Sequence, residues 1–273
     1  MLSVTLEGVP SAANPIDRSD FFVRQHYHDF LNREADDAGL EFWTGGIEIC
    51  RSDEGCREAK RIDASAAFFL SIEFQETGYL AYRVHKTAFG DLPGKPVPIR
   101  FDDFIKDAHE IGLGVVVNVG DWQAQLERNK RAYADGFVRR AAFLARYPTS
   151  QTPAQYVAAL NANAGGALTS SEEADLAARL AAGSETRASV LLRIADDEDL
   201  RNSEKNRAFV LMEYFGYLRR NPDDVGFDGK DDPGFVGYNY WLTKLNSFNG
   251  DFRAAEMVKA FIISIEYRQR SAP

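Results

Sequence analysis

The chain has 273 residues, of which 45% are apolar and 27% charged, and its 32 Lys plus Arg against 41 Asp plus Glu give a formal net charge of -9. This composition is typical of a folded globular protein and excludes a disordered chain. The lack of clustered Lys and Arg argues against nucleic acid as a partner. Because the sequence contains no run of about 18 apolar residues, it predicts no membrane span.

Residues 1–20 are predicted to form an extended linker. The opening stretch, "MLSVTLEGVPSAANPID", has neither a basic leader nor an apolar core of signal-peptide length. Two settings follow from it. Either the protein is cytosolic, or the chain belongs to a longer exported protein in which "PSAANP" is the tail of a linker.

The first predicted helix is followed by a polar corner. Apolar residues recur at helical spacing on one face, namely Phe22, Val23, His26, Tyr27, Phe30 and Leu31. After Arg33 the chain must turn, and Asp36 or Asp37 is predicted to cap the next helix, into which Trp43 is buried. Arg33 is expected to bridge back to a carboxylate or a carbonyl, and Gly39 to allow close packing. The corner is therefore interpreted as a structural brace, with a ligand-binding loop as the alternative.

Two cysteines, Cys50 and Cys56, stand six positions apart across a polar turn. They are too few for a structural zinc site, and their spacing is not that of a CxxC redox centre. A local disulfide is predicted, which implies an oxidising compartment. The alternative is a pair of free thiols beside a loop.

The middle of the chain also predicts helices. Thr152 precedes Pro153 as a helix cap, the Ser170 to Glu173 pattern predicts a capping box, and Gly183 closes that helix. Long helices are expected at about 121–146 and 252–269. The only strand-like run, "GVVVNV" at 114–119, is too short to found a sheet. The predicted fold class is all-α.

A repeat links the two ends of the chain. At an offset of 187 the following residues match: Phe22, Val23, Tyr27, Leu31, Arg33, Asp36 and Asp37 with Phe209, Val210, Tyr214, Leu218, Arg220, Asp223 and Asp224. Beyond an eleven-residue insertion Gly39 and Trp43 match Gly237 and Trp241, and "AFFLSIEF" at 67–74 matches "AFIISIEY" at 260–267.

The predicted repeating unit is a helix, a loop and two further helices, each apolar on one face. The predicted divisions are the linker 1–20, a first repeat unit with a connecting segment at 21–118, a degenerate middle unit at 119–204 and a last repeat unit at 205–273.

These motifs resemble a bacterial domain family of unknown function, marked by an aromatic helix, Gly-Arg-x-Pro-Asp-x-x-Gly and an aromatic-Trp pair. The resemblance covers 21–75 and 205–269. Asn32 and Ala35 depart from the family's Gly and Pro, whereas Pro222 keeps the Pro. The family occurs in exported, S-layer-like and adhesin-like proteins and is distantly similar to phycobilisome linker domains. The resemblance implies an extracellular or cell-surface module, and it supplies no catalytic residues.

The insertion in the last unit is rich in acid, with Asp223, Asp224, Asp228, Asp231 and Asp232 inside "DDVGFDGKDD". Phe235 stands where an EF-hand loop needs a bidentate Glu, so an EF-hand is excluded. The interpretation is a solvated acidic turn, with an irregular calcium site as the alternative. No other cofactor is expected.

No catalytic motif stands out. His26 and His28 point to different sides of a helix and cannot share a metal. Glu73 and Glu266 recur in the "SIE" segments. The predicted function is therefore a non-catalytic module that attaches to a surface polysaccharide or a protein neighbour, with contacts from the loops that hold Arg33, Asp36, Asp37, Arg220, Asp223 and Asp224. The alternative is a small helical glycan hydrolase that uses a carboxylate pair.

Overall fold

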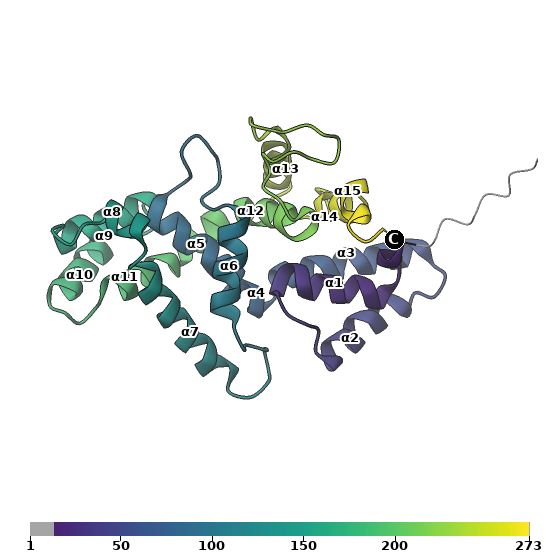
Figure 1. Ribbon diagram of the computed structural model, residues 1–273, viewed down its shortest axis with the longest axis horizontal. Coiled ribbons are helices and arrows are strands. Elements are labelled where there is room, and N and C mark those ends of the chain that lie inside the picture. Colours follow the sequence, from purple (N-terminus) through teal and green to yellow (C-terminus); the bar gives the residue numbers. More distant parts are fainter. Residues whose placement is uncertain (1–13, 273) are drawn as a thin grey trace, which may run out of the picture.

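The computed structural model describes residues 14–272, and within that range every regular element is a helix (Figure 1). The all-α prediction is confirmed, and 114–119 forms turns rather than a strand. The first half contains η1 (Pro15–Asp17), α1 (Ser19–Leu31), α2 (Asp37–Glu48), α3 (Glu54–Leu70), α4 (Ile72–Glu76), α5 (Gly78–Phe89), α6 (Phe101–Gly112) and α7 (Trp122–Phe137). The second half contains α8 (Ala141–Arg146), α9 (Pro153–Asn163), α10 (Ser170–Ala181), α11 (Arg187–Ala195), α12 (Glu198–Glu213), the π-helix η2 (Tyr214–Leu218), α13 (Val236–Ser247), α14 (Met257–Ile262) and α15 (Ile265–Gln269).

Two hydrophobic cores divide the molecule, and they do not follow chain order. Helices α1–α4 share one core with α12–α15, so the first and last predicted units pack together. The rings of Phe69 and Phe209 stack across this core with centroids 4.1 Å apart. Helices α7–α11 surround the second core, at the other end of the elongated molecule in Figure 1.

Helix α5 lies between the two cores and is buried on all sides from Gly78 to Ala88. Tyr79 and Tyr82 belong to the first core, whereas Leu80 and Val84 belong to the second. Even Arg83 is fully buried, where it donates to the carbonyl of Ala195 at 2.7 Å and to Asp196 at 2.8 Å.

Both long helices expected from the sequence are interrupted. The segment 121–146 breaks between α7 and α8, because Arg140 takes an extended conformation and forms two 2.7 Å hydrogen bonds to Asp107. The segment 252–269 contains turns and two short helices, because Ser264 leaves the helical conformation and its side chain caps α15. In both segments a residue with an extended backbone, Arg140 or Ser264, interrupts the helical pattern and precedes a new short helix.

The predicted caps are largely found. Thr152 caps α9 in a capping box with Gln155. The second box is formed by Thr169 and Glu172, one residue before the predicted Ser170 to Glu173 pair, because Thr169 already has the extended backbone that a cap requires. Among residues 14–272, no helix combines the length and apolarity needed to cross a bilayer.

Candidate functional site

The corner after α1 is held by an ion pair. Arg33 donates from Nε and Nη2 to Glu73 at 2.6 and 2.8 Å, and also to the carbonyl of Glu34 at 2.9 Å. Burial alone would lower the pKa of the Arg33 guanidinium, but its hydrogen bonds to Glu73 and Asp36 outweigh burial and raise it. The bridge predicted for Arg33 therefore exists, and its carboxylate comes from the recurring "SIE" segment.

The corner after η2 carries the same contacts. Arg220 donates to Glu266 at 2.5 and 3.0 Å. Asn32 and Arg219, which precede the two arginines, both take the left-handed conformation, with φ of 53° and 55°. The two ends of the chain thus build matching corners, and both "SIE" glutamates are bound to arginine.

A glycine and a tyrosine close each corner. The Oδ1 of Asp36 accepts from the amide of Gly39 at 2.8 Å, which confirms Asp36 as the cap of α2, while Asp37 is the first residue of that helix. A Cβ on Gly39 would overlap the hydroxyl of Tyr27, and one on Gly237 would stand 2.6 Å from the hydroxyl of Tyr214. These glycines are required because a tyrosine occupies the space of a side chain.

The acidic insertion does not repeat the arrangement of the first corner. Asp223 pairs with Lys95 and Arg100, and Asp224 accepts from Arg100 at 2.9 Å. Burial would raise the pKa of the Asp223 carboxyl, but the hydrogen bonds from Lys95 and Arg100 lower it. These two carboxylates therefore hold the insertion against the segment between α5 and α6.

The other acidic residues of the insertion serve its turns. Asp228 accepts from the amide of Lys230 at 3.1 Å, and Asp231 is exposed. Asp232 accepts from the amides of Val236 and Gly237, both at 2.8 Å, and so takes the capping role that Asp36 has in the first corner. Within residues 14–272 no group of three or more His, Cys, Asp or Glu side chains is close enough to hold a metal ion. The structure does not bring the five predicted calcium ligands together.

Cys50 and Cys56 form a disulfide, with their Cα atoms 5.5 Å apart. The predicted bridge is confirmed, and the alternative of free thiols is wrong. The bridge joins the end of α2 to the start of α3, so it fixes the loop between these helices.

Helices α2 and α13 each turn an exposed row of residues outward. On α2 the row, here called the α2 face, contains Ala38, Phe42, Gly45, Gly46 and Ile49. On α13 the row, here called the α13 face, lines a shallow groove and contains Val236, Asn239, Tyr240, Thr243 and Lys244.

The tryptophan beside each face is half-buried rather than buried as predicted. Trp43 lies against Phe68, with ring centroids 6.0 Å apart, and Trp241 lies against Phe261 at 5.8 Å. Each indole also contacts the exposed aromatic residue before it, Phe42 or Tyr240, at 5.0 Å. The outer edge of Trp43 lines a 280 Å³ groove beside Arg33 and Glu73, which explains its exposure.

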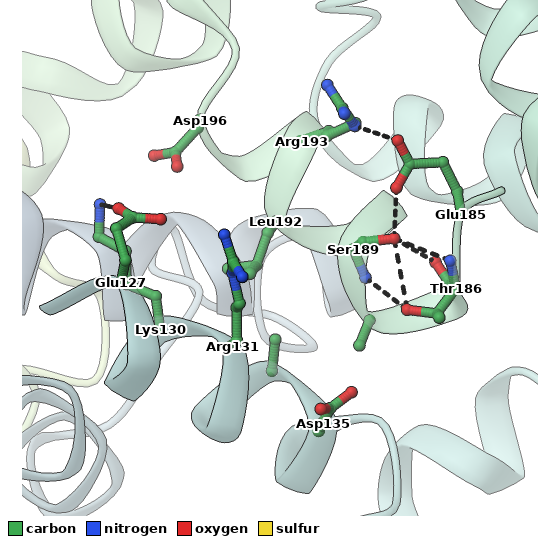
Figure 2. Close-up of a pocket in the computed structure, with 12 residues that line it drawn as sticks. Glu127, Lys130, Arg131, Asp135, Glu185, Thr186, Ser189, Leu192, Arg193 and Asp196 are labelled. Carbon is green, nitrogen blue, oxygen red and sulfur yellow. Dashed lines mark hydrogen bonds and ion pairs between the residues drawn. The ribbon is translucent and has the colours of Figure 1, made fainter. Parts of the chain in front are cut away.

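A groove between α7 and α11 has a volume of about 640 Å³ (Figure 2). None of the residues around it belongs to a motif that the sequence reveals. Its walls carry many charged side chains, and the residues known to line it include no aromatic: Glu127, Lys130, Arg131, Ala134, Asp135, Glu185, Thr186, Ala188, Ser189, Leu192, Arg193 and Asp196.

Most charges along this groove are already paired. Lys130 pairs with Glu76 and Glu127, and Arg193 pairs with Glu185 at 2.5 Å. Figure 2 shows Glu185, Ser189 and Thr186 joined by hydrogen bonds along one wall, at the start of α11. The groove is therefore a polar surface with internal ion pairs.

A buried polar cluster joins α5, α6 and α7. The Oδ2 of Asp107 accepts from Tyr133 at 2.9 Å and lies 2.8 Å from Nε2 of His85, while Arg140 binds both carboxylate oxygens. Burial would raise the pKa of Asp107, but the hydrogen bonds from His85 and Arg140 hold it well below its usual value. All four groups find partners within the cluster, so the cluster ties helices together.

Two buried polar residues, His26 and Glu213, occupy equivalent positions of the first and last units, and the sequence does not mark them as a pair. His26 lies 2.7 Å from the carbonyl of Phe22 and 2.7 Å from Oγ of Ser65, and burial lowers its pKa to about 3. Glu213 occupies the equivalent position in the last unit, at the offset of 187. Its Oε2 has no hydrogen-bond partner among the described residues, and burial raises its pKa well above the ordinary value.

Comparison with protein-family models, with curated proteins and with solved structures finds no match to this chain. The resemblance to the exported domain family therefore stays a prediction.

Proposed function

We propose that this chain is a non-catalytic attachment module of an exported protein, and that it binds a neighbouring copy of itself. The observation that carries the proposal is the pair of exposed apolar faces on α2 and α13. Phe42 is 68% exposed, Ile49 75%, Val236 71% and Tyr240 56%. Large apolar side chains gathered on one exposed surface are typical of interaction sites.

The two faces complement each other in size. Gly45 and Gly46 leave open space on the α2 face, where the equivalent positions of the α13 face carry Thr243 and Lys244. Asp37 and Glu41 are exposed beside the α2 face, whereas Lys244, the charged residue of the α13 face, pairs with Glu256 at 3.6 Å. The larger face of one copy therefore fits the smaller face of the next.

The contact must be intermolecular, because α2 and α13 lie at opposite edges of the molecule (Figure 1). An α2 face that binds the α13 face of another copy leaves one free face at each end of the pair. Such head-to-tail contacts produce rings or open chains of copies.

A protein neighbour fits these faces better than a polysaccharide. Phe42 and Tyr240 present rings on which a sugar can stack, but Ile49 and Val236 on the same faces are branched aliphatic side chains with no flat ring. Hydrolysis also finds little support, since Glu73 and Glu266 are bound to arginines and the groove between α7 and α11 has no aromatic residue among those known to line it.

Sedimentation equilibrium tests the proposal, with the wild type, Phe42→Asp, Tyr240→Asp and the control Leu144→Asp, which changes an exposed apolar residue on α8. We expect the wild type and the control to associate as concentration rises and each face variant to remain monomeric. An equal mixture of the two face variants should form a dimer, because each contributes the face that the other lacks. A mixture that stays monomeric contradicts head-to-tail binding.

The same proteins separate the rival functions. A wild type that is monomeric at every concentration, but binds isolated envelope polysaccharide through Phe42, would favour a glycan-binding module. Hydrolysis of that polysaccharide would favour the enzyme. Association that is lost in chelator and in a further variant with combined Asp223→Ala, Asp224→Ala and Asp228→Ala substitutions would instead indicate that calcium takes part.

A further inference from the structure

Another groove, of about 490 Å³, lies where α3 meets η1 and the C-terminal helices. Four arginines line it, although the chain as a whole is acidic. They come from the disulfide loop, from α3 and from α15: Arg51, Arg57, Arg61 and Arg268. The remaining lining residues are Asp17, Glu54, Glu58, Ile262 and Ile263.

Arg61 has no carboxylate within ion-pair distance among the described residues. Its guanidinium donates to the carbonyls of Ile16 at 2.6 Å and Asp17 at 3.2 Å, and it lies 3.9 Å from the ring centroid of Phe22. Burial lowers the pKa of Arg61; the charge of Asp17 opposes this effect, and the charges of Arg57 and Arg268 add to it. Because no described carboxylate lies within ion-pair distance of this guanidinium, a bound anion would stabilise the cation further.

Arg51 is the second arginine of this groove that forms no ion pair with a carboxylate of the described residues. It is exposed on the loop that the Cys50–Cys56 disulfide closes, and its carbonyl accepts a hydrogen bond from Arg57 at 3.2 Å. Arg57 and Arg61 are four residues apart and so lie on one face of α3. The disulfide therefore holds Arg51 close to the arginine face of α3.

The acidic residues of the groove are mostly neutralised. Asp17 pairs with Arg268 at 2.6 Å, and Glu58 pairs with Lys259 at 2.6 Å. Arg57 pairs with Glu48 at 3.0 Å. This leaves Arg51 and Arg61 against the single carboxylate of Glu54, so the groove carries a local positive charge.

We infer that this groove binds an oxyanion group, with Arg51 and Arg61 as its principal partners. A guanidinium presents two parallel N–H groups, which match a carboxylate, a sulfate or a phosphate. The groove is larger than a single ion needs, and Ile263 supplies an apolar edge. Its ligand is therefore an anionic group carried on a larger molecule. This inference does not depend on the proposed self-association, since the groove shares no residue with either face.

Calorimetric titration with inorganic phosphate, sulfate and glucuronate tests the inference, at a constant ionic strength set by sodium chloride. We expect saturable binding of at least one of the three anions. Stronger binding of glucuronate assigns the groove to a carboxylate, and stronger binding of phosphate or sulfate assigns it to a tetrahedral oxyanion.

Two variants and a control locate the binding. Arg51→Asn suits the left-handed backbone at this position, and Arg61→Met keeps an apolar stem over Phe22. Each should weaken binding about tenfold, as expected for the loss of one charge-assisted hydrogen-bonding group. Arg24→Gln, which removes an exposed arginine outside the groove, should have no effect.

Reduction of the disulfide should also weaken binding, because Arg51 is then no longer held in place. Circular dichroism confirms that each variant is folded before titration. Folded Arg51→Asn and Arg61→Met proteins that bind as well as the wild type would overturn the inference. So would a loss of the same size in Arg24→Gln, or no saturable binding of any anion by the wild type.

Discussion

His26 and Glu213 occupy equivalent positions in two units, and burial shifts their pKa values in opposite directions. The pKa of His26 falls from 6.5 to about 3 on burial, so the stability that the neutral ring supports is present above pH 6.5 and lost as the pH falls. The pKa of Glu213 rises above 4.5, so the stability that its protonated form supports is present below pH 4.5 and lost as the pH rises. Between pH 4.5 and 6.5 the two residues therefore change the free energy of unfolding with pH in opposite directions.

Single substitutions should expose each slope. In Glu213→Gln the free energy of unfolding should fall, relative to the wild type, as the pH is lowered from 6.5 to 4.5. In His26→Gln it should rise over the same range. Each slope can reach about 1.4 kcal/mol per pH unit. Urea unfolding followed by tryptophan fluorescence measures both, with the exposed Glu198→Gln as control, and parallel pH profiles in all four proteins would contradict the prediction.

Removing only the arginine of the corner ion pair should lower the free energy of unfolding more than removing the arginine and the glutamate together. Arg33→Met leaves the buried Glu73 carboxylate without its cation, and we expect a loss of about 2 to 4 kcal/mol in unfolding free energy. The double variant with Glu73→Met should recover part of this loss, because no unpaired charge remains. Urea unfolding of both singles and the double forms a double-mutant cycle, and strictly additive losses would mean that the pair is not coupled.

Several residue roles could be predicted because they are local. Asp36 caps the helix that begins beside it, and Cys50 and Cys56 are close in sequence, so their partners lie within a few residues. In the last unit Asp232 takes the capping role that Asp36 has in the first unit, because the insertion changes the path of the chain before α13. Glu213 gave no signal, since an isolated glutamate in a helical pattern is ordinarily exposed.

At the scale of elements, the glycines of α2 differ sharply in what they tolerate. Gly39→Ala should lower the free energy of unfolding by about 1 to 3 kcal/mol, because its Cβ meets the hydroxyl of Tyr27. Adding Tyr27→Phe should restore part of this loss. Gly45→Ala, with no atom within 4 Å of its Cβ, should instead stabilise the helix by about 0.5 to 1 kcal/mol. Thermal unfolding compares the four proteins, and equal effects at Gly39 and Gly45 would show that the tyrosine does not set the restriction.

Apolar spacing predicts which segments are helical, but it does not predict where the helices end or that helix α5 is buried on all sides. The breaks at Arg140 and Ser264 depend on hydrogen bonds to Asp107 and to a local amide, which apolar spacing does not show. Helix α5 contains Arg83, His85 and Lys86, which apolar spacing does not mark as buried. Their burial requires Asp196, Asp107 and Asp91, which lie on other elements or in loops.

At the scale of the whole molecule, the first and last units form one folding unit. Phe69, Phe209 and Tyr217 belong to a single core, so residues 14–76 leave that core half built. A protein ending at residue 204 keeps the whole second core, so we expect it to retain an unfolding transition of that core while α1 and α3 lose their protection from hydrogen exchange. Co-expression with residues 205–273 should restore the protection. Hydrogen exchange read out by mass spectrometry gives the measurement, and protected α1 and α3 amides in the truncated protein alone would contradict a shared core.

The repeat could be seen in the sequence, but the pairing of its two copies could not. Offsets between matching residues show that two segments form similar corners, without showing which apolar face meets which. The stacking of Phe69 on Phe209 and the contact between Phe30 and Tyr217 settle that the copies face each other across one core.

The shared core also has a consequence for synthesis on the ribosome. Phe69 and Phe209 are about 140 residues apart, so at about 5 to 20 residues per second the first unit waits on the order of ten seconds for its partner. During that interval Phe69 lacks Phe209 and Phe30 lacks Tyr217, so the faces that these rings cover stay open. Pairings of such long sequence separation fold slowly and leave nascent chains open to aggregation. A chaperone that holds the emerging α1 and α3 would therefore raise the yield of folded protein.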